Sequence, residues 1–456
     1  LCRSSAASDV YKRQQLKIQD IQQSQRKIDW EINKSLWHLV DLEFEEERGS
    51  FDFEARRIGS CKADLSKLKW KAKDNTLELN LQTRSLAKNK TAAVCPEIFV
   101  QIQVDEFSVS MDASFSSQIE SKSHDFVFEM VFASNPDESI FGHGEQFSYI
   151  DLKGKVLPIF VQEQGLFRRK HLRKVIKSAL PVLQKMFGGM KFSEKVVGDD
   201  FSTYFPMPQY LSSDDYLFYL KNSELSVFDH SRKRQRHVFA FSKNFSGEWL
   251  FGGGPRDLLQ KFGSRVGKMT APPDWTQNGL IVGVQGGQEK VEKIQALLKK
   301  NNVAVAGYWL QDWVGQRTTS FGKQLWWQWV LDKEHYPRWH AMREKLEKKK
   351  QYLLGYFNPF LVPKEKVAEG QRDLFEEAKS AGYLVKNQQG DVYPSPVTFT
   401  AYLVDLTNPQ AYFWLKEVMK EVVRKTKMKG WMADFGEALP VDAALYSCLL
   451  YTSPSP

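Results

Sequence analysis

Two carboxylates stand just behind a short apolar run near the end of the chain. In the stretch MKGWMADFGEALP, residues 428–440, the apolar run ends on Asp434, and Glu437 follows three residues later. A carboxylate walled by Trp431 and other aromatic side chains is suited to stabilising a positively charged sugar carbon. Hydrolysis of a glycoside through such a transition state uses two carboxyl groups. The residues alone therefore favour glycoside chemistry centred on Asp434.

Sequence signatures of other catalytic classes do not accompany these carboxylates. The eight histidines are scattered, and no cysteine pair has the spacing of metal ligands. The chain contains no GxSxG motif, and its glycine run FGGGPRD lacks the Lys-Ser/Thr of a phosphate-binding loop. We therefore expect neither a metal nor a cofactor.

The part of the chain that carries Asp434 alternates apolar runs with helical stretches. Helices are predicted near residues 288–300, 336–349, 364–380 and 409–425, with apolar runs such as VAVAGYWL, YLLGYF and FTAYLV between them. This repeat is typical of a parallel β/α barrel or a doubly wound sheet. In a barrel, the active site lies at the carboxyl ends of the strands. The polar residues at these ends are Gln311, Asp312, Asn358, Asp405 and Asp434. Asp405 is equally suited to capping the following helix.

The first half of the chain has a different texture. Short segments of alternating polar and apolar residues, such as TLELNLQT and DFVFEMVF, are separated by Gly, Asn, Asp and Ser turns. This pattern predicts antiparallel strands and most simply a β-sandwich, interrupted by an amphipathic helical insertion near residues 170–190. The predicted domains are a sandwich over 15–255, a linker over 256–275 and a partial catalytic barrel over 276–446.

Both ends of the chain resemble translated sequencing-adapter tails. Residues 1–14 read LCRSSAASDVYKRQ and residues 447–456 read SCLLYTSPSP, and neither carries a hydrophobic period. We exclude them from the fold prediction. Of the four cysteines, Cys61 and Cys95 then remain, which are too few for a disulfide framework.

The positive charge of the chain is concentrated in runs. The formal net charge is +9, and the densest basic runs are RRKHLRKVIK at 168–177 and SRKRQRH at 231–237. Because no nucleic-acid-binding signature accompanies them, solvated loops or a rim that attracts an anionic substrate are the preferred interpretations. No apolar stretch reaches the roughly 20 residues that cross a bilayer. We expect neither a nucleic acid nor a membrane as a partner, and the oligomeric state is left open.

Three segments resemble glycoside hydrolase family 31, in its bacterial sulfoquinovosidase branch: GWMADFGE, YWLQDWVGQRTTSFGKQLWWQW and GHGEQFSYIDLKGKVLPIFVQEQG. The resemblance implies a β-sandwich followed by a (β/α)8 barrel, truncated here to about its first half. It also implies a retaining α-glycosidase with Asp434 as the nucleophile of a covalent glycosyl-enzyme. Glu437 is then a partner of a sugar hydroxyl, or supports another site residue without touching the sugar, rather than the acid, because it lies only one turn beyond the nucleophile. The family's general acid comes from a later strand, so the chain is expected to be a fragment without turnover of its own.

The same resemblance bears on the substrate. It assigns Gln311 and Trp327 to substrate binding, but the sulfonate-binding arginine of this pattern is replaced by Gln324. Gln324 itself and Asp312, at the same strand end as Gln311, are further candidate binding residues. A neutral amide binds an anion less strongly than a guanidinium does. Lys323 or Arg317 could compensate, although neither occupies the matching position. Sulfoquinovosides are therefore the first expectation, neutral α-glucosides or α-galactosides the second, and a catalytically inactive sugar-binding scaffold the third.

Two further expectations concern the substrate rim and the compartment. Glu163 and Gln164 belong to a sandwich loop that reaches the barrel mouth in the family, so they are candidate rim residues or simply turn residues. Asn33, Asn89 and Asn244 lie in N-x-S/T sequons, which would suit a secretory or lysosomal enzyme. The bacterial relatives are cytoplasmic and the cysteines are few, which slightly favours the cytoplasm.

Overall fold

The structure is a computed structural model. It describes residues 16–19, 27–47, 50–86, 95–115, 125–162, 200–319, 322–363, 372–395, 400–436, 439–440 and 443–447. The chain divides into two compact units that meet in sequence between Lys268 and Met269. This boundary lies within the linker that the sequence predicts over 256–275. The helical insertion expected near 170–190 lies outside the described residues.

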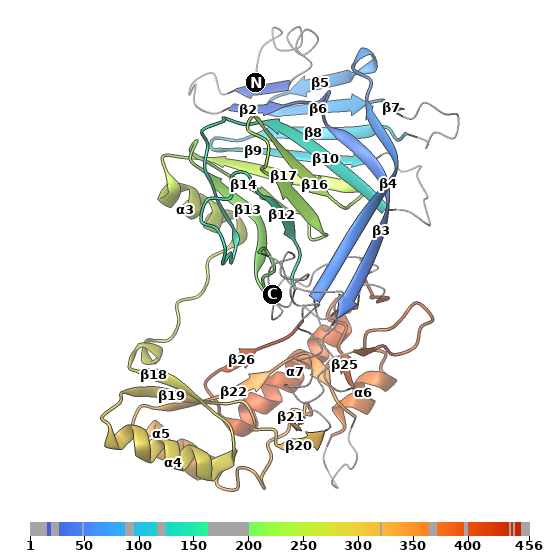
Figure 1. The fold of residues 1–456 in the computed structure, drawn as a ribbon. Coiled ribbons are helices and arrows are strands. Elements are labelled where there is room, and N and C mark those ends of the chain that lie inside the picture. The colour runs from blue at the N-terminus through green and yellow to red at the C-terminus, as the bar shows by residue number, and fades with distance from the viewer. Residues whose placement is uncertain are drawn as a thin grey trace, which may run out of the picture. The chain divides into compact units, whose positions relative to one another are not determined.

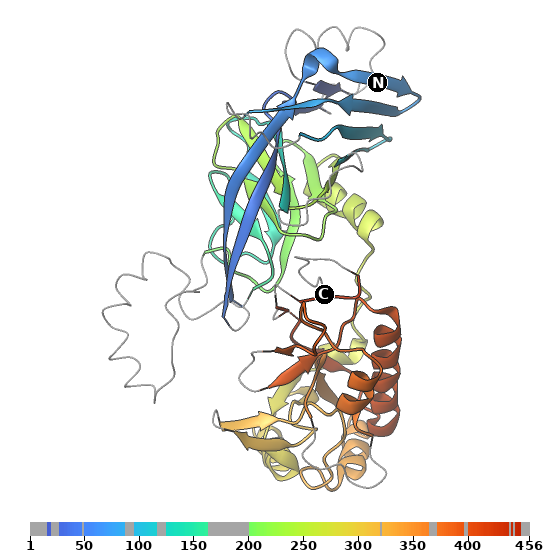
Figure 2. The ribbon, with the colours of Figure 1, turned by 90° about the vertical axis from the view of Figure 1, so that its right-hand side faces the viewer.

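The first unit is built from two antiparallel sheets (Figures 1 and 2). One sheet has the order β12 (Val156–Ile159), β15 (Ser226–Asp229), β16 (Gln235–Ala240), β10 (Asp125–Ala133), β3 (Leu36–Glu47), β4 (Ser50–Ala63) and β7 (Thr83–Ser85). In the same sheet β1 (Leu16–Gln19) pairs with β2 (Lys27–Trp30), which pairs with β10. The other sheet has the order β11 (Ile140–Gly144), β13 (Pro206–Ser212), β14 (Tyr216–Leu220), β17 (Asn244–Phe251), β9 (Ser108–Phe115), β8 (Ile98–Val104), β6 (Thr76–Leu81) and β5 (Lys69–Lys73).

Strand alternation forms the core of this unit. In β8, alternate residues are buried, and Val100 packs in one cluster with Met111 of β9 and with Phe128 and Met130 of β10 in the opposite sheet. Because both sheets contribute one apolar face to the same core, the predicted β-sandwich is confirmed. Helix α3 (Pro255–Val266) covers a second small cluster through Leu258, and the short 3-10 helix η1 (Leu65–Lys67) links β4 to β5.

A basic run of the sandwich points partly inward. Arg236 is 4% exposed, forms an ion pair with Glu138 and donates a hydrogen bond to Tyr210 at 3.0 Å. The next residue, His237, is also buried. The interpretation of 231–237 as a fully solvated run is therefore wrong, because the end of the run forms β16 and its charge is compensated inside the sheet.

The two cysteines outside the excluded tails are bonded to each other. A disulfide joins Cys61 in β4 to Cys95, just before β8, and closes a sequence separation of 34 residues. The sequence analysis set these residues aside because two cysteines make no framework. A single bridge needs only that the two chain segments meet, which the strand pairing determines.

The second unit contains a four-stranded parallel sheet. Its order is β18 (Leu280–Val284), β19 (Val305–Leu310), β22 (Tyr352–Phe357) and β26 (Trp431–Ala433). The short 3-10 helix η2 (Asp274–Gln277) precedes β18, and helices α4 (Gly287–Lys300), α5 (Trp339–Glu347) and α7 (Pro409–Thr426) lie in the crossovers. A hairpin of β20 (Gln316–Thr319) and β21 (Gly322–Leu325) follows β19. The described strands and helices confirm the predicted β/α repeat.

One predicted barrel strand belongs to another sheet. Strand β25 (Ala401–Leu403) pairs antiparallel with β23 (Phe360–Leu361) and β24 (Pro394–Ser395), in an excursion that also contains α6 (Leu374–Ser380). The prediction failed because a short apolar run fits a hairpin strand as well as a buried parallel one. Asp405 therefore does not end a barrel strand. It accepts bonds from the Thr407 and Tyr446 amides, while Asn408 caps α7.

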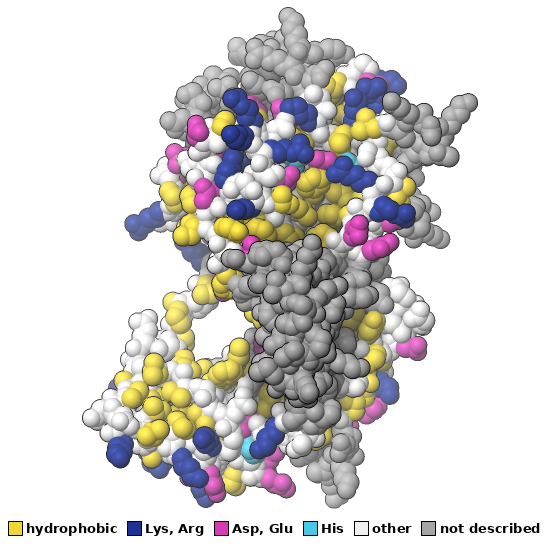
Figure 3. Space-filling model, in the orientation of Figure 1, with side chains coloured by type: hydrophobic (Ala, Val, Ile, Leu, Met, Phe, Trp, Pro, Cys, Tyr) yellow, Lys and Arg dark blue, Asp and Glu magenta, His cyan; other side chains and the backbone are white. Residues whose placement is uncertain are grey.

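Apolar side chains are exposed on the outer strands of the described parallel sheet. Leu280 and Ile281 of β18 are exposed, as are Trp431 and Met432 of β26. Figure 3 shows hydrophobic side chains gathered on the surface over β18 and β19. Among the described residues, no helix has the length and apolar character that a membrane span requires.

Candidate active site

Polar residues follow three strands of the parallel sheet at the same edge. Gln311 and Asp312 follow β19, Asn358 follows β22, and Asp434 follows β26. The parallel register pairs Phe357 with Ala433, so β22 and β26 end side by side. Carboxyl ends of parallel strands are where β/α folds place their ligands. The structure therefore brings these predicted residues to one edge.

Asp434 continues the ladder one residue beyond β26. Its backbone amide donates to the Phe357 carbonyl at 3.0 Å, and its partly exposed side chain accepts a hydrogen bond from the Tyr356 hydroxyl at Oδ2, at 2.7 Å. Among the described residues, no other group bonds this carboxylate side chain. Its Oδ1 is therefore available to a ligand as far as the described residues determine.

The turn behind Asp434 has an unusual backbone. Phe435 has a φ of 62° and Gly436 a φ of 130°. The left-handed region costs a non-glycine residue energy, so packing must hold Phe435 in place. Its ring lies 5.4 Å from that of Trp327 and 5.8 Å from that of Phe360, between ring centroids. Aromatic packing thus determines the course of the chain directly after the carboxylate.

Tyr356 connects this edge of the sheet to the interior. The side chain is 1% exposed, and its backbone carbonyl accepts a bond from Trp313 Nε1 at 2.9 Å. Asn358 Nδ2 donates to the Tyr356 hydroxyl oxygen at 3.2 Å, and Asn358 Oδ1 accepts from the Phe360 amide at 2.9 Å. The sequence analysis missed Tyr356 as a site residue because a tyrosine within an apolar run looks like a core residue.

Asp312 is enclosed by protein groups. Its side chain is fully buried and accepts bonds from the Gly286 and Gly287 amides, from His335 Nε2 at 2.6 Å and from the Tyr336 hydroxyl. Burial, followed by the charge and hydrogen bond of Asp312, raises the pKa of Tyr336 well above its ordinary value. The structure thus gives Asp312 the role of an anchor, and its predicted contact with substrate would require these bonds to be exchanged.

Glycine is required in the turn that Asp312 holds. Gly286 and Gly287 both have positive φ, of 118° and 78°, which directs their two successive amides at one carboxylate oxygen. A Cβ on Gly287 would lie 3.0 Å from the His335 ring and carbonyl. This turn begins α4, so the anchor fixes the connection between β18 and the first helix.

The remaining predicted binding residues lie directly after β19, in the hairpin that follows it and just beyond that hairpin. Gln311 is partly exposed and accepts a bond from the Gln285 side chain. Gln324 lies directly across the hairpin from Arg317, whose guanidinium carbon is 4.4 Å from the Trp326 ring centroid. Trp327 is buried against Phe360 and Phe435. Glu437, Glu163 and Gln164 lie outside the described residues.

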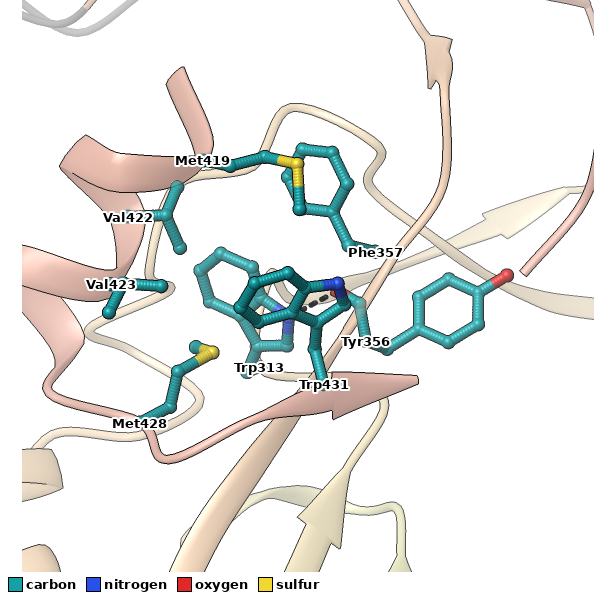
Figure 4. Close-up of a pocket in the computed structure, with 8 residues that line it drawn as sticks. All are labelled: Trp313, Tyr356, Phe357, Met419, Val422, Val423, Met428 and Trp431. Carbon is teal, nitrogen blue, oxygen red and sulfur yellow. Dashed lines mark hydrogen bonds between the residues drawn. The ribbon is translucent and has the colours of Figure 1, made fainter. Parts of the chain in front are cut away.

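Trp431 is placed with the helices rather than with Asp434. It lines a small apolar pocket with Trp313 and with Met419, Val422 and Met428 (Figure 4). Successive side chains of a strand alternate between its faces, so Trp431 and Asp434, three positions apart, project to opposite sides. Figure 4 also shows the Tyr356 ring directed away from this pocket. Trp431 thus lines this pocket while part of its side chain stays exposed, and its contact with a sugar stays a prediction.

Within the described ranges, no three or more His, Cys, Asp or Glu side chains converge as metal ligands would. The groups gathered at the strand ends are instead one partly exposed carboxylate, a phenol and two amides. Such a set can hold a polar, hydroxyl-bearing ligand and offer an anionic oxygen to an electrophilic carbon.

Comparison with known proteins agrees with this chemistry. Residues 269–450 match the TIM-barrel domain of glycosyl hydrolases family 31. The chain is 34% identical over 316 residues to a sulfoquinovosidase of Escherichia coli, covering 69% of this chain and 44% of that protein. It is also 34% identical over 319 residues to a sulfoquinovosidase of Agrobacterium fabrum, covering 68% and 44%. The chain thus spans less than half the length of these curated relatives.

A solved structure extends the similarity to the sandwich. A family 31 sulfoquinovosidase from E. rectale, in complex with an aza-sugar inhibitor, superposes with a TM-score of 0.79 at 27% identity, over 97% of this chain and 60% of that one. The predicted fold class, a β-sandwich followed by part of a TIM barrel, is therefore confirmed.

Proposed function

Because the chain belongs to glycoside hydrolase family 31, we propose that the whole protein is a retaining α-glycosidase that forms a covalent glycosyl-enzyme on Asp434. The observation that carries this proposal is the position of Asp434. It is the partly exposed carboxylate at the end of a parallel strand, and one of its oxygens is already held by Tyr356. A nucleophile needs a fixed side chain with one accessible oxygen.

The reaction proceeds in two balanced steps. In the first, an electron pair of Asp434 Oδ1 forms a bond to the anomeric carbon, the glycosidic bond breaks, and the leaving oxygen takes a proton from a second carboxyl group. In the second, water attacks the anomeric carbon from the opposite face, and the electron pair of the ester bond returns to Asp434. The same second carboxyl group, now ionised, takes the proton of the water. The resemblance assigns that carboxyl group to a later strand than β26.

For the substrate, we propose terminal α-sulfoquinovosides. The relatives at 34% identity are named sulfoquinovosidases, and a sulfonate is an anion at every physiological pH. Gln311 offers a neutral amide where a carboxylate would repel this anion. Trp327 and Gln324 are proposed to bind the same end of the sugar, with Glu437, Glu163 and Gln164 as further contacts.

A second candidate is hydrolysis of neutral α-glucosides or α-galactosides. The observation that favours it is Gln324 itself, since an amide gives only neutral donors. Arg317 lies opposite Gln324, and paired residues of adjacent antiparallel strands project to the same face. The positive charge of Arg317 on this face favours an anionic substrate over a neutral one.

The test compares three substrates on the whole protein. Aryl α-sulfoquinovoside should be hydrolysed with a higher kcat/KM than aryl α-glucoside or aryl α-galactoside. A mechanism-based glycosyl fluoride should label Asp434, as read by peptide mass spectrometry. Labelling of another residue would exclude the nucleophile, whereas faster hydrolysis of a neutral glycoside would favour the second candidate.

A further inference from the structure

The structure holds the proposed nucleophile from one side through a chain of two buried residues. Asn358 and Tyr356 are 2% and 1% exposed, and their side chains lead by hydrogen bonds to Asp434. From this arrangement we infer that Tyr356, directed by Asn358, is a positioning residue that acts mainly on the breakdown of the glycosyl-enzyme. This inference rests on the proposed function of Asp434.

The bond between Asn358 and the Phe360 amide determines which groups donate and which accept along this series of hydrogen bonds. Asn358 Oδ1 accepts from the Phe360 backbone amide at 2.9 Å, so the end of the side-chain amide that faces Tyr356 is Nδ2, which can only donate. The phenol oxygen therefore accepts from Asn358. Its single O–H is directed to Asp434 Oδ2, at 2.7 Å.

The backbone of Tyr356 is also held in place. Trp313 Nε1 donates to the Tyr356 carbonyl at 2.9 Å, and the parallel register fixes Tyr356 beside Met432, two residues before Asp434. A buried tyrosine on a central strand has little freedom to follow a moving carboxylate. The bond therefore restricts the rotation of the Asp434 carboxylate and leaves Oδ1 to meet the anomeric carbon.

The charge on the Asp434 carboxylate decides whether the Tyr356 hydrogen bond accelerates the formation or the breakdown of the glycosyl-enzyme. In the glycosyl-enzyme, Asp434 is a neutral ester, and a neutral acceptor forms a weaker hydrogen bond than an anion does. During breakdown, the bond between Oδ1 and the anomeric carbon breaks and its electron pair returns to the carboxylate. The O–H of Tyr356 then stabilises a charge that grows toward the transition state. In the forward attack the charge declines, so the bond helps only by positioning.

Tyr356→Phe in the whole protein tests this inference on an activated aryl α-sulfoquinovoside. We expect kcat to fall about tenfold to a hundredfold, the range for loss of one hydrogen bond to a charged group. KM should fall as well, because the glycosyl-enzyme accumulates, and a burst of aryl alcohol should precede the steady state.

Two further variants keep the test decisive. Asn358→Asp retains the acceptor for the Phe360 amide but offers the phenol a carboxylate, so the O–H turns away from Asp434 and kcat should fall although the tyrosine is intact. Tyr308→Phe removes a buried hydroxyl from the neighbouring strand β19 and leaves the hydrogen bonds of Tyr356 intact. Its kcat and KM should therefore match those of the unsubstituted protein. If Tyr356→Phe does not fold, Asn358→Asp decides.

The outcomes separate this inference from the proposed function. If the glycosyl fluoride labels Asp434 but both variants keep the unsubstituted kcat and KM, the inference is wrong and the nucleophile stands. If kcat falls while KM is unchanged and no burst appears, Tyr356 is merely structural and the inference is also wrong. If the unsubstituted protein neither hydrolyses an aryl α-glycoside nor becomes labelled, the proposed function fails and the inference fails with it.

Discussion

The carboxylates of Glu129 in the sandwich and of Asp434 in the second unit differ in how completely protein groups satisfy them. In the sandwich, Glu129 accepts from His237 Nδ1 at 2.6 Å through one oxygen and pairs with His38 Nε2 at 2.7 Å through the other. Burial alone would raise its pKa, but the bonds to His237 and His38 prevail and lower the pKa to about 2. In the parallel sheet, Asp312 is equally enclosed, whereas Asp434 has one oxygen held by Tyr356.

The difference separates structural from chemical carboxylates. A carboxylate whose oxygens all bond to protein groups stabilises the fold and cannot attack a substrate without losing those bonds. A carboxylate held at one oxygen is fixed in orientation yet still able to react. By this criterion Asp312 resembles Glu129 of the sandwich more than it resembles Asp434 at the same edge of the sheet.

The largest expected effect follows from removing the reactive carboxylate. Asp434→Asn in the whole protein should lower kcat on an aryl α-glycoside by at least about 1,000-fold, since loss of a nucleophile removes the covalent route. The melting temperature should change little, because the side chain is partly exposed. Asp405→Asn is the matched control at the end of the antiparallel strand β25 and should keep kcat. A comparable loss of kcat in both variants would contradict the distinction between structural and reactive carboxylates.

The second effect tests whether Asp312 is an anchor. Asp312→Asn places an amide donor among the Gly286, Gly287 and Tyr336 donors, so one or more of these buried groups lose their acceptor. We expect the free energy of unfolding to fall by about 3 kcal/mol, as for a broken buried charged pair. Unfolding in denaturant measures this change in the free energy of unfolding. A raised KM without loss of stability would instead support the direct substrate contact that the sequence predicts.

Sequence reasoning located Asp434 because local pattern determines strand ends. An apolar run that stops on a polar residue is visible without knowing its neighbours, and the β/α repeat places such ends at one edge. The parallel sheet and the sandwich followed from the same periodicities. What can be predicted from the sequence is therefore whatever depends on nearby residues.

The features that sequence reasoning missed depend on long-range register. Tyr356 reaches Asp434 only because Phe357 pairs with Ala433, 76 positions along the chain. The Cys61–Cys95 bridge and the burial of Arg236 against Glu138 likewise depend on which strands pair. Strand β25 was assigned to the wrong sheet because three residues carry too little pattern to identify their partners.

Acidification should destabilise the sandwich. His143 is buried, which lowers its pKa to about 3, and burial with the nearby His143 charge lowers the pKa of His230 well below its ordinary value. A lowered folded-state pKa means that the unfolded chain binds more protons, so the stabilisation is complete above about pH 6.5 and is lost as pH falls toward 3. Glu129 adds a further loss of stability as the pH falls from its ordinary pKa of 4.5 toward about 2.

His143→Gln isolates the histidine contribution to this acid sensitivity. The variant removes one titrating group and should flatten the dependence of the melting temperature on pH between about 6.5 and 4.5, although its absolute stability at pH 7 falls. Below about pH 4.5, where Glu129 takes up its proton, the dependence of the melting temperature on pH should keep its slope. An unchanged slope in the upper region would mean that His143 already titrates normally in the folded sandwich, against its full burial.

The smallest expected effect concerns the β20–β21 hairpin rather than a carboxylate. Gln324→Arg places a second guanidinium opposite Arg317, on the same face of β20 and β21. If this face binds the sulfonate, kcat/KM for aryl α-sulfoquinovoside should rise about tenfold, the gain of one charge-assisted hydrogen bond of about 1.4 kcal/mol, and that for aryl α-glucoside should not. Lys323→Arg, one position along the strand and on the other face, is the matched control. Equal gains from both substitutions would indicate a general increase of positive charge and would argue against an anion site on this face.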